Sequence, residues 1–100
     1  MQEEQIALKK GTARGFVIPL GSVNLVGAVA PRGMIGCGAF DVQALDRFGY
    51  PAARVKPTGS ESIASIGDLL AGEIKEANPS AVKLGVTVGM SGTQALELLC

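Results

Sequence analysis

"VNLVGAVAPRGMIGCGAF", residues 23–40, decides how this chain folds. Two apolar runs, 23–30 and 34–40, contain mostly β-branched and small residues, which is typical of strands. Between them lies Pro31-Arg32-Gly33, a turn sequence too short to connect anything but antiparallel strands. The stretch therefore predicts two neighbouring antiparallel strands, with 23–30 at the centre of a sheet.

The residues before this stretch predict two more strands. Glu4, Ile6 and Leu8 follow the alternating pattern of a strand, and Lys10-Gly11 predicts a turn after it. A second strand is expected over 14–20, where Pro19 indicates a sheet edge or a strand end. Four consecutive strands with short links predict an antiparallel meander.

After residue 40 the pattern becomes mixed. Asp41 is a good N-cap for a helix that stops at Gly49, and 52–57 predicts a short strand. A second helix is expected to open at Ser60 or Ser62, because apolar residues three and four apart form a core-facing stripe, namely Ile63, Ile66 and Leu70.

The last thirty residues continue this alternation of strand and helix. An edge strand is expected over 72–77, followed by a helix capped by Asn78 with Pro79 at its first position. Ser91 and Gln94 have the spacing of a capping box for a final helix. The chain is therefore predicted to be one domain, 1–100, with a two-layer α+β fold: a mostly antiparallel sheet and helices on one face.

Composition bounds the function. Hydrophobic residues make up 47% of the chain and charged residues only 18%, which favours a homo-oligomer with apolar surface left for a partner subunit. Nine basic and nine acidic side chains cancel, so we expect no nucleic-acid partner.

Membranes and export are not expected either. The uncharged stretch 15–30 is interrupted by Pro19 and several polar or glycine residues, and it is too short for a membrane span. The N-terminal residues show no secretory signal, so we expect a cytoplasmic protein whose two cysteines are free thiols.

The sequence contains no histidine, and this excludes most catalytic and metal chemistry. Without imidazole, Ser-His and Cys-His nucleophiles are ruled out, and so are nearly all zinc sites. The stretch "GCGAFD" resembles a dinucleotide fingerprint, but Asp41 occupies the place of its third glycine. We expect no metal and no cofactor.

Cys37, which lies between Gly36 and Gly38, has two interpretations. It could be a reactive thiol in front of a helix start, with Asp41 or Arg32 tuning the site. Alternatively it is a small buried side chain, since unpaired cysteine is among the most buried residue types. The second interpretation is favoured, because no histidine is present to activate the thiol.

Two further groups are candidates for binding a small anionic ligand. Arg32, Arg54 and Lys56 would share one rim with Asp41 if strands 34–40 and 52–57 are neighbours. The amides at the start of the last helix, with Ser91 and Thr93, form the second candidate. Solvated strand ends and an ordinary capping box are the alternatives, and the capping box is favoured.

The blocks "RGMIGCGAFDVQAL" and "VGMSGTQALELL" make the chain similar to the YunC-like family, catalogued as domain of unknown function 1805. The resemblance covers nearly the whole chain and implies a single-domain α+β protein of bacteria and archaea. It implies no activity and no catalytic residues. Cys37, Gly38, Gly89, Met90 and Gly92 lie in the shared motifs, where a glycine can serve backbone geometry alone.

The sequence leads to two functional hypotheses. The first is a non-enzymatic domain that self-associates through an apolar sheet face or edge and binds a small ligand. The alternative is a thiol-dependent enzyme or redox-responsive protein that uses Cys37.

Overall fold

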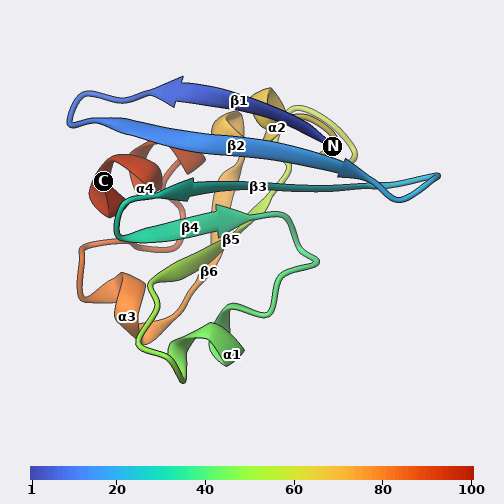
Figure 1. Ribbon diagram of the computed structural model, residues 1–100. Coiled ribbons are helices and arrows are strands. Elements are labelled where there is room, and N and C mark those ends of the chain that lie inside the picture. The colour runs from blue at the N-terminus through green and yellow to red at the C-terminus, as the bar shows by residue number, and fades with distance from the viewer.

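The apolar stretch at residues 23–40 forms the middle of a six-stranded sheet in the computed structural model, which describes residues 1–100 (Figure 1). The predicted meander is confirmed, since each of the first four strands pairs antiparallel with the next. They are β1 (Gln2–Ala7), β2 (Thr12–Pro19), β3 (Asn24–Ala30) and β4 (Gly33–Gly36). Pro19 is the last residue of β2, where its missing N–H costs no ladder hydrogen bond.

The second half of the chain alternates helices with two strands. In order, the elements are α1 (Val42–Asp46), β5 (Ala52–Lys56), α2 (Ile66–Ala71), β6 (Glu73–Ala77), α3 (Pro79–Val82) and α4 (Gly92–Leu99). The strands follow one another across the sheet in chain order. Only β4 and β5 pair in parallel, and residues 37–51 form the crossover connection between them.

The main core lies between the sheet and the helices α2 and α4, which Figure 1 shows behind the sheet. Alternate residues of the central strands, among them Val26, Ala28 and Ile35, point into it and are fully buried. Helix α4 contributes Ala95, Leu96 and Leu99 from one stripe. The predicted α+β fold with a mostly antiparallel sheet is confirmed. The helices do not all lie on one face, however, because Val42 of α1 packs on Met34 and Ala52 on the opposite side of the sheet from α2 and α4.

The predicted helix caps are confirmed at Asp41, Asn78 and Ser91, but the cap predicted for the second helix is wrong. Helix α2 is capped by Ser65, and not by Ser60 or Ser62. The Ser65 hydroxyl accepts from the Asp68 amide at 3.1 Å, and the Asp68 carboxylate accepts from the Ala64 amide at 3.1 Å. This reciprocal pair satisfies two free amides, so the helix starts there.

Asn78 is the one fully buried polar side chain, and it forms hydrogen bonds with four backbone groups. Its Oδ1 accepts from the amides of Ala52 at 3.1 Å and Ala81 at 2.9 Å. Its Nδ2 donates to the carbonyls of Val42 at 2.8 Å and Tyr50 at 2.9 Å. One carboxamide therefore holds both ends of the α1 segment, the start of β5 and the start of α3.

The two edges of the sheet differ. At the β6 edge, the Ile74 amide donates to the Met90 carbonyl at 2.8 Å, and the Gly89 amide donates to the Ile74 carbonyl at 2.9 Å. The loop before α4 therefore covers that edge at Ile74. Strand β1 pairs with β2 alone, so its other edge is free.

We expect Asn78→Ala to lower the free energy of unfolding by about 3 kcal/mol, because it leaves several buried backbone groups without partners. Asn24→Ala is the control, since Asn24 makes one exposed hydrogen bond to the Ala64 carbonyl; its cost should be about 1 kcal/mol or less. Urea denaturation measures both, and equal costs would contradict a central role for Asn78.

Candidate functional site

The sheet has a second side, opposite α2 and α4, which we call the outer face. The cross-strand register defines it: Glu3 lies opposite Phe16, Phe16 opposite Gly27, and Gly27 opposite Gly36. The same row continues through Arg54 to Glu76. Because opposed residues share a face, this row crosses all six strands on the outer side.

Two phenylalanine rings pack against the two glycines of this row. A Cβ added at Gly27 would overlap the Phe16 ring, and one at Gly36 would overlap the Phe40 ring. The rings meet edge to face, with centroids 6.3 Å apart and an interplanar angle of 77°. Glycine is needed here for this close approach, and the aromatic rings cover the exposed backbone in its place.

Only half of the outer face is covered. Val42 of α1 packs on Met34 and Ala52, with Phe40, Leu45 and Tyr50 around them, so this small second core covers β4 and β5. Over β1 to β3 nothing covers the sheet, and Val29 is 43% exposed. A groove of about 680 Å³ lies there, bordered by apolar side chains that include Phe16, Ile18, Val29 and Pro31.

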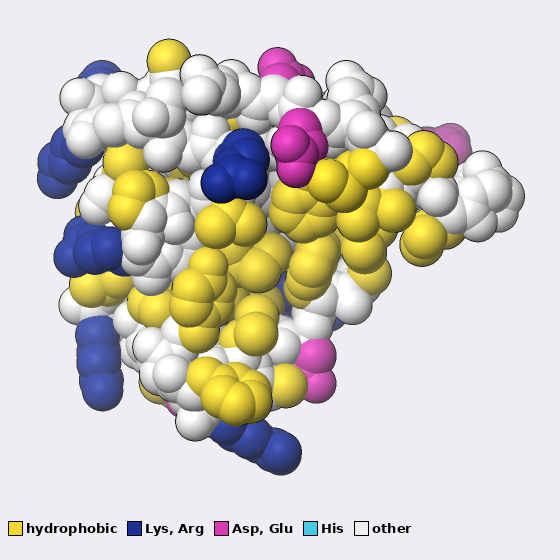
Figure 2. All heavy atoms as spheres, in the orientation of Figure 1, with side chains coloured by type: hydrophobic (Ala, Val, Ile, Leu, Met, Phe, Trp, Pro, Cys, Tyr) yellow, Lys and Arg dark blue, Asp and Glu magenta, His cyan; other side chains and the backbone are white.

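Figure 2 shows hydrophobic side chains gathered over this face, with a basic and an acidic side chain at its upper border. Glu3 and Arg14 line the groove and are exposed. Neither takes part in the ion pairs of the chain, which are Arg54–Glu76 and Lys56–Glu73. We call Phe16, Ile18, Val29, Glu3 and Arg14, with the strands that carry them, the open half of the outer face.

These residues carry a sequence signal. Arg14, Phe16 and Ile18 alternate along β2, which places them on one face of the sheet, away from Ala13 and Val17. The alternation does not predict whether a helix covers that side, and in the structure none does.

At the β5 end of the same face lies a polar cluster. Arg54 forms an ion pair with Glu76 at 2.7 Å and donates to the Gly38 carbonyl at 3.4 Å, while its buried Nε has no partner. The Gln43 side chain donates to Glu76 at 2.9 Å. That hydrogen bond, followed by the charge of Arg54, lowers the pKa of Glu76, and Asp41 nearby opposes the shift.

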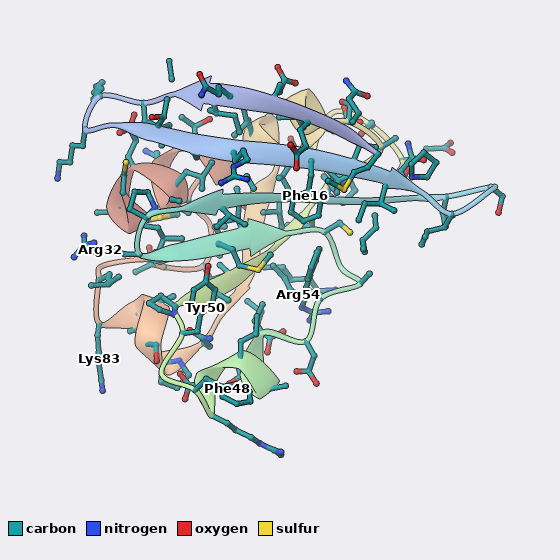
Figure 3. The ribbon with its side chains drawn as sticks, viewed as in Figure 1. Phe16, Arg32, Phe48, Tyr50, Arg54 and Lys83 are labelled. Atoms are coloured by element: carbon teal, nitrogen blue, oxygen red, sulfur yellow. The ribbon has the colours of Figure 1, made fainter.

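The structure does not bring all the residues of the predicted cationic rim together. Arg54 and Asp41 do lie near the same cluster, although the Asp41 carboxylate caps α1 by accepting from the Ala44 amide at 3.0 Å. Lys56 is 3.7 Å from Glu73. Arg32 lies at the other end of β4 from Arg54 (Figure 3).

Arg32 serves the C-terminal end of α4. Its Nη2 donates to the Leu98 carbonyl at 2.8 Å, and its Nε donates to the Cys100 carbonyl at 3.2 Å. A cation here satisfies free carbonyls and complements the helix dipole. This contact accounts for Arg32 without any ligand.

The start of α4 also uses its polar groups internally. Ser91 and Gln94 form the predicted capping box, with bonds of 2.9 and 3.1 Å. Thr93 donates to the Leu70 carbonyl at 3.2 Å, and the Gly92 amide donates to the Gly72 carbonyl at 3.0 Å. The end of α2 therefore lies against this helix start, and anion binding by Ser91 and Thr93 stays a prediction.

Cys37 is 7% exposed and belongs to the main core. It also borders a second cleft, of about 380 Å³, between the β2–β3 turn and the loop before α2. The cleft is lined by polar groups as well, including Ser22, Asn24, Glu61 and Ser62. Cys37 and Cys100 are both free thiols.

Two further observations concern the whole chain. None of the helices combines the length and the apolar character that a membrane span needs. No three histidine, cysteine, aspartate or glutamate side chains come together in a way that could hold a metal ion.

A family model described as "Domain of unknown function (DUF1805)" matches residues 36–99, a segment that runs from the end of β4 to the end of α4. No functionally curated protein matches the sequence.

A solved structure shares the fold. It is the crystal structure of a protein of unknown function, TA1206 from Thermoplasma acidophilum, with a TM-score of 0.85 and 22% sequence identity. The match covers 99% of this chain and 92% of that one. The strands β1 to β3, which lie outside the family match, are therefore part of the shared fold.

We expect the Arg54–Glu76–Gln43 cluster to make stability depend on pH. Because the pKa of Glu76 is lowered below its ordinary value of 4.5, its contribution is present above that value. It is lost as pH falls through the lowered folded value. Glu76→Gln should therefore unfold at lower urea concentration than wild type at pH 7, with the difference shrinking toward pH 3. A difference independent of pH would contradict this role of the carboxylate.

Proposed function

The chain belongs to the family Domain of unknown function (DUF1805), whose description assigns no activity, and we propose that it is a non-enzymatic protein that self-associates through the open half of its outer face. The partner is a second copy of the chain. The observation that carries this proposal is a sheet face over β1 to β3 with exposed Val29 and a groove of about 680 Å³ beside it.

The chemistry of this surface supports an interface between copies. Phe16 supplies a rigid aromatic surface, and Ile18 and Val29 extend it with aliphatic groups. Contiguous apolar surface bordered by polar groups is the usual composition of a protein–protein contact. Glu3 and Arg14 border the face with one charge of each sign, so two copies can meet there without net repulsion.

A cytoplasmic location is part of the proposal. Both thiols are free, as expected in a reducing compartment.

We expect Val29→Glu to abolish self-association, because it places a charge in the centre of the contact. Val88→Glu is the matched control, since Val88 is also an exposed valine (68%) but lies in the loop before α4, away from the proposed contact. Light scattering coupled to size exclusion gives the mass of each variant, and circular dichroism checks that both fold. The proposal fails if wild type is monomeric at micromolar concentration, or if both variants associate as wild type does.

A thiol-dependent function at Cys37 is the second candidate, and the cleft beside that residue favours it. In a Cys100→Ser background, buried Cys37 should react with iodoacetamide at least about tenfold more slowly in the folded protein than in urea, because only an accessible thiolate reacts. Equal rates would instead favour the thiol-dependent function, with the cleft as the route of access.

A further inference from the structure

Glu3 and Arg14 lie close together on the open half of the outer face. In the register of β1 and β2, Glu3 is opposite Phe16, and Arg14 is opposite Gln5. The two charged residues are therefore diagonal neighbours on adjacent strands, and their side chains point to the same side of the sheet. Both are exposed, and both line the groove.

Neither side chain has a partner within the chain. The two ion pairs, Arg54–Glu76 and Lys56–Glu73, lie on β5 and β6, and no side-chain hydrogen bond involves Glu3 or Arg14. Glu97, the acid nearest the β1–β2 turn, accepts from the Lys9 amide at 3.1 Å with both of its oxygens. The border of the open half thus keeps one unpaired acid and one unpaired base.

A two-fold axis turns this arrangement into a self-complementary one. In an interface of that symmetry the same patch is used twice, so that if residue i contacts residue j of the partner, then j contacts i. A patch with one acid and one base can form two such contacts, and every charge in it is then neutralised.

We propose that two copies pack their outer faces about a two-fold axis, so that Glu3 of each copy forms an ion pair with Arg14 of the other. This inference rests on the proposed self-association and specifies its geometry. The apolar side chains Phe16, Ile18 and Val29 supply the contact area, and the two reciprocal ion pairs fix the orientation of one copy against the other.

Charge reversal tests the pairing between copies. Glu3→Arg alone and Arg14→Glu alone each set like charges against one another in a homodimer, and each should weaken association by at least about tenfold. Glu61→Arg and Arg47→Glu are matched controls, because both residues are exposed and form no ion pair in the chain. Both controls should associate as wild type does.

Mixing the two weakened variants gives the deciding result. In a heterodimer of Glu3→Arg with Arg14→Glu, each introduced charge faces an opposite charge on its partner, at both symmetry-related contacts. Native mass spectrometry should therefore show the heterodimer in excess over both homodimers, with an affinity restored toward that of wild type.

The remaining outcomes separate this inference from the proposed function. If the single variants weaken association but their mixture does not restore it, Glu3 and Arg14 do not face each other across the interface and the inference is wrong. If both single variants associate as wild type does while Val29→Glu does not, the proposed self-association through the apolar contact is supported. The reciprocal ion pairs are then wrong. A monomeric wild type overturns both.

Discussion

The Asn78 carboxamide is the interaction on which the arrangement of the outer face depends. It binds the Val42 and Tyr50 carbonyls and the Ala52 amide, so it fixes residues 42 to 52 against the sheet. Those residues carry the second core of Val42, Met34 and Ala52. A buried amide with all four of its hydrogen-bonding positions filled is specific in a way that apolar contacts are not, because any shift of the segment leaves a polar group without a partner.

The half-covered outer face follows from the direction of the strands. Antiparallel neighbours need only short turns, and β1 to β4 are joined in that way. The parallel pair β4–β5 needs a crossover connection, and residues 37–51 supply it across the outer side. The chain therefore covers its outer face only where a parallel pair occurs. The apolar surface over β1 to β3 is not covered by any other part of the chain.

Much of this fold could be predicted from local sequence, since caps and turns are local interactions. Asp41, Asn78 and Ser91 each precede the amides that they cap, and all three were predicted correctly. Ser65 was missed as the cap of α2 because Ser60 and Ser62 carry the same hydroxyl group nearby. The hydrogen bond from the Ala64 amide to Asp68 and the packing of the core determine which serine starts the helix. Arg32 could not be assigned, because its partners at Leu98 and Cys100 are more than sixty residues away in the chain. Arg54 and Lys56, which were predicted to share a rim with Arg32, instead form ion pairs with Glu76 and Glu73.

The difference between the two sheet edges affects how the folded protein can aggregate in concentrated solution. Fibres grow when one sheet edge templates another without limit, which requires two open edges on every molecule. Here the Met90 and Gly89 backbone groups already pair with Ile74 of β6, whereas the outer edge of β1 has no partner. Accidental pairing of two β1 strands uses up this open edge of each molecule. Pairing through β1 alone therefore ends at two chains.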